Sequence, residues 1–262
     1  DLASVCAACD LLIDAGTYDQ IRDAAREDMF FLGAFILRRP DLRKQWLLER
    51  CDEVQADPNE HLDLWARYHY KPTIITFVGI IFEIIKDPEV TIAIFSHTRP
   101  IAKAFLRQIK REFEQNELLK NLFPEIFYDD PSKEAPSWSE DNGICVKRKG
   151  NPKENTLEAW GLVDGQPTSK HFKIRNYDDI VTLESVTNED MRQKVLDALE
   201  MSFNLGEPSG HARYAGTRYH FADAYATLME RGSVRTRIHP VVDKQGKPVL
   251  LSVEDMTKKR TE

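Results

Sequence analysis

The sequence predicts an α/β protein in which a mostly parallel central sheet is flanked by helices and preceded by an N-terminal helical subdomain. Beyond residue 60, apolar runs of strand length alternate with longer amphipathic segments, which is the βαβα order of a doubly wound sheet. Val90–Phe95 is almost continuously apolar and rich in β-branched residues, as buried parallel strands are. Residues 1–47 instead repeat apolar side chains at helical spacing, with charges between them.

The elements follow from apolar spacing and from turn residues. The N-terminal helical section ends at Pro40, and an amphipathic helix is expected over Asp41–Gln55. The later expected elements are strand Leu62–Ala66, helix Thr73–Ile85, strand Val90–Phe95, a helix from Ile101 to about Glu117, a strand Ile144–Lys147 within a loop-rich region 124–155, strands Thr156–Val163 and His171–Tyr177, a helix to about Asn204 opened by a Thr187–Asp190 capping box, a loop Gly206–Gly210, strand His211–Ala215, a helix over about Ala222–Glu230 and a β segment near Val234–Ile238.

Composition indicates a soluble globular chain of 262 residues, with 42% hydrophobic and 30% charged residues. The longest apolar candidate, Ile74–Ile85, is interrupted by Glu83 and is shorter than the roughly 18 residues of a membrane span. The first residues lack the pattern of a signal peptide, so we expect a cytosolic protein. The net charge of −7 provides no global attraction for nucleic acid. A local DNA grip through residues 147–149 is one interpretation of that basic cluster, and a solvated loop is the other.

Four cysteines occur, and two of them, Cys6 and Cys9, have the spacing of a metal-binding pair. No second Cys or His pair accompanies them at usable spacing, so we expect two reduced thiols on one side of a helix.

The segment His61–Phe77 contains a short apolar strand, a turn of polar and aromatic residues, Lys71 and the start of an apolar helix. This is the layout of a phosphate-binding P-loop, in which backbone N–H groups and a lysine attract phosphate oxygens. The sequence departs from the P-loop consensus G-x-x-x-x-G-K-[ST], because Trp65 and Tyr70 stand at the glycine positions and Pro72 at the hydroxyl position. An ordinary strand-to-helix turn is the alternative interpretation.

A nucleotide site on this loop would use Lys71 at the β- and γ-phosphates, and Thr73 or its backbone in place of the missing hydroxyl for Mg²⁺. Pro72 fits a first helical turn but has no N–H for a phosphate, so we expect weaker binding than with serine. The candidate nucleotide-binding residues are Arg67, Tyr68, His69, Tyr70, Lys71, Pro72 and Thr73, together with Gln55, which would contact adenine or else be a surface glutamine.

Asp178 and Asp179 follow an extended segment, at the place where magnesium-binding and water-activating carboxylates lie in such ATPases. Asp178 is the candidate metal ligand, with Thr73, and Asp179 the candidate for activating water. Glu184 is a rival for that catalytic role, because aspartate is one methylene shorter than the usual glutamate. A solvated Asp-Asp turn is the alternative.

Two further features concern the γ-phosphate. Thr217, after Gly216 at a strand end, would place a hydroxyl near it, although such endings are common in strands. Arg67, four residues before Lys71, would stabilise transition-state charge in cis or reach a neighbouring subunit. Arg218 and Arg99 are weaker candidates for the same role.

Taken together, these stretches resemble the large subunit of tailed-phage terminases, the motor that packages the genome. The similarity runs from about Trp46 to Gly232 and rests on five blocks in one order. The blocks are Leu64–Lys71, Ile94–Lys103, Gly161–Thr168, Tyr177–Ser185 and Gly216–Phe221.

The resemblance implies an additional-strand P-loop (ASCE) ATPase that uses ATP and Mg²⁺. It implies that Arg67 and Lys71 belong to Walker A, Asp178 and Asp179 to Walker B, and Gly216-Thr217 to the coupling motif, with Gln55 near the adenine motif. The implied partners are double-stranded DNA, the portal protein and the small terminase subunit, in a homo-oligomeric ring transiently on the prohead in the host cytoplasm. An isolated domain is expected to be monomeric and slow.

The resemblance also divides the chain. We expect a helical subdomain over 1–45, the ATPase core over 46–252 and the start of a linker over 253–262, without the nuclease activity of the family. Family members that share the His-Tyr-Lys sequence continue with Ser-Thr, and Pro72 stands at the position of that serine. Two alternatives stay open: another P-loop ATPase such as a helicase, and a nucleotide-binding interaction module that has lost catalysis.

Overall fold

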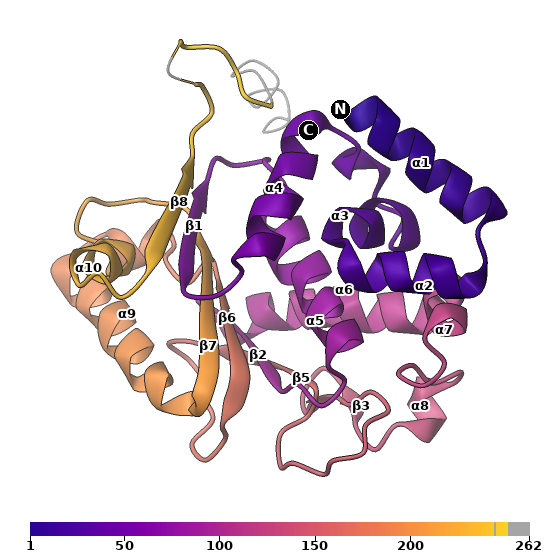
Figure 1. Cartoon of the computed structure of the whole chain (residues 1–262). Coiled ribbons are helices and arrows are strands. Elements are labelled where there is room, and N and C mark those ends of the chain that lie inside the picture. The colour runs from indigo at the N-terminus through magenta and orange to yellow at the C-terminus, as the bar shows by residue number, and fades with distance from the viewer. Residues whose placement is uncertain (244, 251–262) are drawn as a thin grey trace.

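The computed structural model describes residues 1–243 and 245–250, and it has an α/β fold with an eight-stranded mixed sheet (Figure 1). The strand order is β3-β4-β5-β2-β6-β7-β1-β8. Six strands, from β5 to β8 in that order, run parallel, and the β3–β4 and β4–β5 pairings are antiparallel. The predicted mostly parallel sheet is confirmed. The expected linker segment 253–262 lies outside the described residues.

The strands differ in length and in polarity. The strands are β1 His61–Trp65, β2 Ile92–Ser96, β3 Trp138–Ser139, β4 Gly143–Ile144, β5 Leu157–Gly161, β6 Phe172–Asp178, β7 Gly206–Gly216 and β8 Arg235–His239. Strands β1 and β2 are buried at every position. Burial on both faces explains why β2 is almost entirely apolar.

The helical elements cover both faces of the sheet. They are α1 Leu2–Ala15, α2 Tyr18–Glu27, α3 Met29–Phe31, the π-helix η1 Leu32–Ile36, η2 Pro40–Leu42, α4 Gln45–Ala56, the π-helix η3 Pro72–Val78, α5 Gly79–Lys86, α6 Arg99–Gln115, α7 Glu117–Leu122, α8 Pro131–Glu134, η4 Glu184–Val186, α9 Glu189–Ser202, η5 Phe203–Leu205 and α10 Ala224–Glu230. No helix within the described ranges has the length and apolarity that crossing a bilayer requires.

Two hydrophobic cores lie on opposite faces of the sheet. The larger joins the N-terminal helices to α5 and α6, and it contains Phe30, Phe77 and Ile94. The smaller lies under α9 and α10 and contains Phe95 and Tyr177. Ile94 and Phe95 are consecutive in β2 and point to opposite faces, as strand geometry requires. Figure 1 shows α9 and α10 on one side of the sheet and α3 to α6 on the other.

The parallel register brings the carboxyl ends of β1, β7 and β6 to one edge of the sheet. Leu64 is opposite Gly216, and Asp178 is opposite Ala215. Strand β8 fixes β1 from the other side through a buried ion pair, in which Arg237 donates to both carboxylate oxygens of Asp63 at 2.8 Å. Residues that follow these strand ends therefore meet although they are far apart in sequence.

Several predicted boundaries differ from the structure. The helix expected from Asp41 begins at Gln45, because Pro40–Leu42 forms a 3₁₀ turn and Lys44 is extended. The strand expected at Ile144–Lys147 is reduced to Gly143–Ile144.

Further along the chain, the expected loop Gly206–Gly210 belongs to β7, whose pairing with β6 is irregular there. The Thr187–Asp190 capping box is wrong, since Asn188 caps α9 by accepting from the N–H of Met191. The region 124–155, expected to be loop-rich, also carries the short helix α8.

Candidate functional site

A loop of residues 66–71, called here the Lys71 loop, leaves the carboxyl end of β1 and enters the π-helix η3. Tyr68 and Tyr70 in this loop have φ angles of 63° and 59°. Left-handed backbone costs a residue with a Cβ about 1–2 kcal/mol, so glycine is the usual choice at such positions. Trp65 stands where the P-loop pattern has its first glycine, but it is a buried residue of β1. The two left-handed positions are therefore Tyr68 and Tyr70.

His69 stabilises the loop from the buried side. Its side chain is buried, and its Nδ1 lies 2.8 Å from the carbonyl oxygen of Arg67. Its ring makes an edge-on contact with Trp46, with 5.4 Å between the centroids. Burial lowers the pKa of His69, so the neutral ring with a proton on Nδ1 fits this geometry. A buried ring between two residues in left-handed backbone holds the turn in shape.

The backbone of the loop is available to an anion. Among the described residues, no acceptor takes the N–H groups of Tyr68, Tyr70 or Lys71. Pro72, at the first position of η3, has no N–H to contribute. Successive N–H groups without an intramolecular acceptor at a helix start form a concave site that favours negative charge.

The side chain of Lys71 is almost entirely buried, and its Nζ donates to Oδ1 of Asp179 at 2.9 Å. Asp179 directly follows β6, has a φ of 46°, and is about half exposed. Its N–H donates to the carbonyl oxygen of Ala215 at 2.9 Å, which fixes its position relative to β7. The buried ammonium therefore meets its carboxylate at the open side of the site.

Asp178 lies beneath this pair and is fully buried. Its Oδ2 accepts a short hydrogen bond from the hydroxyl of Thr76, which in turn accepts from Nδ2 of Asn176 at 3.1 Å. Its Oδ1 is buried and has no hydrogen-bond partner among the described residues. Burial raises the pKa of Asp178 to about 7, opposed by the Lys71 charge and the Thr76 hydrogen bond and assisted by Asp179.

These groups border a pocket of about 520 Å³, a volume within the usual range for small-molecule sites. Its lining comes from the Lys71 loop, from the start of η3 and from the ends of β6 and β7. The lining residues are Ala66, Arg67, Tyr68, His69, Tyr70, Lys71, Pro72, Thr73, Asp179, Thr217 and Tyr219. The structure thus brings together the predicted residues 67–73 with Asp179 and Thr217.

The far wall of the pocket is formed by the segment after β7. Arg67 donates a short hydrogen bond to the hydroxyl of Tyr219, and its guanidinium lies 5.4 Å from the centre of that ring. Before this segment, Gly216 packs so closely on Tyr225 that a Cβ would lie 2.3 Å from the ring carbon Cζ. Only glycine allows this approach, and the approach determines where Thr217 leaves β7.

Asp178 is buried and does not itself line this pocket, and four other predicted residues are not brought to it. The amide of Gln55 is engaged by the N–H of Met29 and the carbonyl of Glu27, at 2.6 and 2.7 Å. Glu184 is exposed at the start of η4. Arg99 donates to the carbonyl of Asp141, and Arg218 pairs with Asp223 at the start of α10.

Sequence reasoning missed Thr76, Asn176 and Tyr219. Thr76 is the residue that bonds Asp178, whereas Thr73 lines the open pocket. Thr76 lies four residues after Pro72, about one helical turn further into η3. The signal was a second threonine, three residues after Thr73, in a π-helix whose other residues are apolar.

The chain was also compared with known proteins. No protein-family model matches the sequence, and a search of curated proteins finds no significant match.

Proposed function

We propose that this chain is a Mg²⁺-dependent ATPase of the P-loop class, with residues 66–71 as its phosphate-binding loop. The observation that carries the proposal is the meeting of Lys71 with Asp179, next in sequence to buried Asp178, in the lining of one pocket. P-loop enzymes use a lysine at the phosphates, and carboxylates for Mg²⁺ and the attacking water, to transfer a phosphoryl group. Lys71, Asp178 and Asp179 are residues of these types, and they lie at the carboxyl ends of parallel strands.

The strand order supports the additional-strand class in particular. Strand β7 lies between β1, which leads to Lys71, and β6, which ends in Asp178. The left-handed backbone at Tyr68 and Tyr70 supports the loop assignment, because it provides without glycine the local conformation for which such loops normally use glycine.

The residues fit a magnesium ion. Oδ1 of Asp178 is buried without a partner among the described residues, and the charges of Lys71 and Asp179 lie close enough to shift the pKa of Asp178. No cluster of three or more metal-ligating side chains occurs in residues 1–243 and 245–250, which suits Mg²⁺, since it commonly binds one or two carboxylates, substrate phosphates and water. Asp178 would hold the ion with a threonine hydroxyl, and the bound ion would neutralise charge on the β- and γ-phosphates.

In the proposed reaction, Lys71 and the free N–H groups of the loop bind the phosphates. The phosphates compete with Asp179 for the Lys71 ammonium and so release the carboxylate. Asp179 then orients a water molecule and accepts its proton as the water oxygen bonds the γ-phosphorus and ADP leaves. Arg67, which lines the same pocket, stabilises the charge that develops on the transferred group.

At the level of biology, we propose the motor domain of a terminase large subunit, which hydrolyses ATP to package double-stranded DNA into a phage prohead. The support is the order of the five sequence blocks together with the meeting of residues from three of them in the lining of the pocket. Portal protein, small terminase subunit and a homo-oligomeric ring follow from that assignment as proposed partners, and the host cytoplasm as the proposed location.

The test is phosphate release from ATP and Mg²⁺ by the purified chain, beside Lys71→Ala and Asp179→Ala. Both variants should lose at least about 100-fold in rate. Lys103→Ala and Asp141→Ala are matched controls, because that exposed pair joins the same residue types at 2.7 Å outside the pocket. Activity equal to the parent in either site variant would contradict the proposal.

Pro72 favours one second candidate, a module that binds nucleotide without hydrolysing it. Proline removes an N–H from the phosphate site, and equilibrium binding separates the two functions. Binding of ATP that depends on Lys71, with no phosphate release by the parent, would support the module. Pro72→Ser is expected to tighten ATP binding, and unchanged affinity would contradict that role of the proline.

A further inference from the structure

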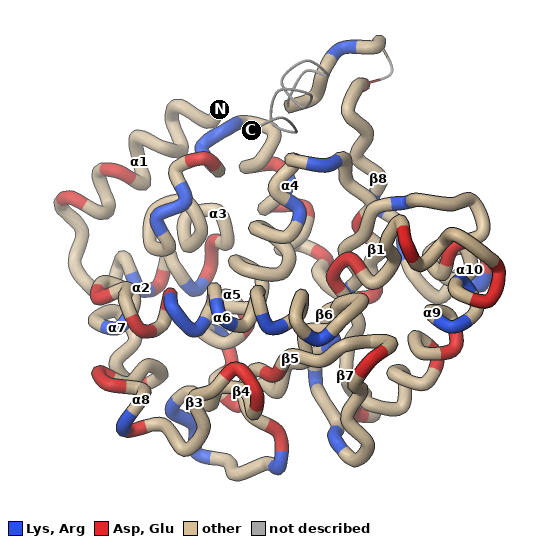
Figure 2. The backbone as a smooth tube through the Cα atoms, turned by 180° about the vertical axis from the view of Figure 1, so that it is seen from behind, with Lys and Arg blue, Asp and Glu red and all other residues tan. Residues whose placement is uncertain are grey.

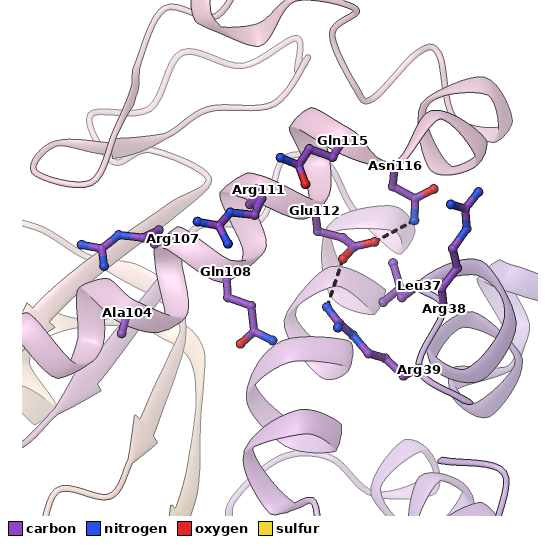
Figure 3. A pocket seen from close by; sticks show the side chains of 10 residues that line it. All are labelled: Leu37, Arg38, Arg39, Ala104, Arg107, Gln108, Arg111, Glu112, Gln115 and Asn116. Carbon is purple, nitrogen blue, oxygen red and sulfur yellow. Dashed lines mark hydrogen bonds and ion pairs between the residues drawn. The ribbon is translucent and has the colours of Figure 1, made fainter. Parts of the chain in front are cut away.

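A second cavity, of about 540 Å³, lies between helix α6 and the chain that follows η1 (Figure 3). Glu112, the carboxylate in its lining, has both oxygens engaged, by Arg39 at 3.1 Å and by Asn116 at 2.7 Å. Figure 3 shows Arg38 and Arg111 pointing apart on opposite sides of Glu112. The contacts of Glu112 therefore join α6 to the chain after η1, and the polar side chains in this lining do not converge on a ligand.

Basic residues on α6 also serve to hold a neighbouring turn. Figure 2 shows lysine and arginine repeated along this helix. Lys103 pairs with Asp141 at 2.7 Å and Arg107 with Glu140 at 2.6 Å, and both acidic residues belong to the turn between β3 and β4. These two ion pairs attach the turn to α6, so this part of the helix has a structural role.

His97, which follows β2 and is half-buried, reaches instead to the chain that follows β6. Its Nδ1 lies 3.0 Å from the carbonyl oxygen of Ile180. A carbonyl oxygen can only accept, so Nδ1 carries the proton and donates. No other donor to this carbonyl occurs in residues 1–243 and 245–250. None of the residues 94–103 lines the Lys71 pocket, and this hydrogen bond links their segment to the site.

The contact holds one side of the turn that carries Asp179. Strand β6 lies between β2 and β7 in the sheet. On the β7 side, the N–H of Asp179 donates to the carbonyl oxygen of Ala215 at 2.9 Å, and on the β2 side the carbonyl of Ile180 accepts from His97. The φ of Asp179 is 46°, and such a left-handed conformation persists where the surroundings over-determine it. Hydrogen bonds from both neighbouring strands provide that constraint.

The turn after β5 in turn fixes His97. The N–H of Leu162 donates to the carbonyl oxygen of Ser96 at 2.8 Å. The next N–H, of Val163, donates to the carbonyl oxygen of His97 at 3.4 Å. Oδ1 of Asp164 accepts from the first N–H of α6 at 3.0 Å, so the chain on the other side of His97 is bound to the same turn. Support of this kind from surrounding groups keeps a positioning side chain in one place.

We propose that His97 is a positioning residue, which holds the Asp179 carboxylate in place at Lys71 through the carbonyl of Ile180. The inference rests on the proposed ATPase function. Among the described residues, Asp179 lines the pocket and His97 does not, so His97 acts through Asp179 and leaves nucleotide binding to the loop. A reacting group displaced by about 1 Å can cost about 100-fold in rate, so a hydrogen bond that fixes this turn affects turnover more than affinity.

Three substitutions at His97 separate the hydrogen bond from packing. Asparagine has an amide N–H near the position of Nδ1, glutamine has its amide near the position of Nε2, and leucine keeps bulk without a donor. The kcat for ATP should fall by about 10-fold or more in His97→Leu and His97→Gln, and stay within about threefold of the parent in His97→Asn. ATP affinity, measured by equilibrium titration, should stay within about threefold in all three variants.

Amide hydrogen exchange, followed by NMR, provides a readout that does not depend on ATP hydrolysis. The N–H of Asp179 should exchange with solvent about 10-fold faster or more in His97→Leu and His97→Gln, because its bond to Ala215 opens more often when the turn is free on the β2 side. His97→Asn should keep the rate of the parent. The amides within β6 should keep parental rates in every variant, which establishes that the fold is intact.

His171→Leu is the matched control. His171 is exposed, directly precedes β6 at the end opposite to Asp179, and lies outside the lining of the Lys71 pocket. This variant should leave both kcat and the exchange of the Asp179 amide unchanged.

Three outcomes would overturn the proposal. They are kcat and exchange equal to the parent in His97→Leu, an equal loss in His97→Asn and His97→Leu, and a loss of ATP affinity as large as the loss of kcat. A parent protein without Lys71-dependent phosphate release would contradict the ATPase function instead. The hold of His97 on the Asp179 turn would then stand or fall on the exchange rates alone.

Discussion

The ammonium of Lys71 lies 2.9 Å from Oδ1 of Asp179, although the two residues are 108 positions apart in the sequence. Lysine is buried and aspartate is about half exposed, so the carboxylate of the pair stays in contact with solvent in the lining of the pocket. In the proposed ATPase, the phosphate-binding cation is therefore paired with the water-activating carboxylate until nucleotide binds.

Asp179→Asn should separate binding from hydrolysis. The carboxylate competes with phosphate for Lys71, so ATP affinity should rise by up to about fivefold, which is what a partly exposed ion pair of about 0–1 kcal/mol allows. Phosphate release should fall by about 100-fold or more, because the proton acceptor is lost. Equilibrium titration and single-turnover release measure the two effects. Asp141→Asn, in an exposed pair elsewhere, serves as the control, and weaker ATP binding by Asp179→Asn would count against the competition.

Thr76→Val should destabilise the fold by about 1–3 kcal/mol. The Thr76 hydroxyl donates to fully buried Asp178, and a buried carboxylate oxygen that loses its donor bears the full cost of desolvation. Urea unfolding measures the change. Thr227→Val, at a partly buried helical threonine, is the control and should change stability by less than about 0.5 kcal/mol. Equal values for the two variants would show that the Thr76–Asp178 contact does not stabilise the fold.

The sequence was sufficient for the parts of the site that depend on local pattern. The buried strand β1, Lys71 at the start of a helix and the acidic pair at the end of β6 are all properties of short segments. The prediction failed where contacts cross the fold. Gln55 is held by the N–H of Met29, and no local signal on α4 indicates that packing.

The same limit applies to the backbone of the Lys71 loop and to the helix after it. Tyrosine is a poor predictor of left-handed φ, so the sequence did not identify Tyr68. The π-helical form of η3 determines which threonine reaches β6, and a periodicity of 3.6 residues cannot distinguish it from an α-helix.

Gly216→Ala should destabilise the fold by about 1–3 kcal/mol and reduce phosphate release. The new methyl would lie 2.3 Å from Cζ of Tyr225, so the ring or the end of β7 must move, and Thr217 would move with it. Gly165→Ala is the control, since its nearest neighbour would be 3.9 Å away. Tyr225→Leu should recover part of the loss in the double variant. If the effects of Gly216→Ala and Tyr225→Leu simply add in the double variant, the defect of Gly216→Ala does not arise from its contact with Tyr225.

Acid should destabilise the protein partly through His69. Burial lowers the pKa of His69 below its ordinary value of 6.5, so the folded state binds a proton less readily than the unfolded state. The stability that this provides is present above pH 6.5 and is lost as the pH falls through the lower folded-state pKa. The free energy of unfolding, measured by urea at pH 7.5 and 5.5, should therefore decrease.

His69→Asn is the informative variant, because asparagine can donate from the position of Nδ1 to the carbonyl oxygen of Arg67 but does not titrate. It should be less stable than the parent at pH 7.5, since the contact with Trp46 is lost, yet it should lose less stability between pH 7.5 and 5.5. The remaining slope should include His239, whose pKa is also lowered by burial and by Arg50. If His69→Asn loses as much free energy of unfolding as the parent between pH 7.5 and 5.5, then His69 takes up its proton as readily in the folded loop as in the unfolded chain.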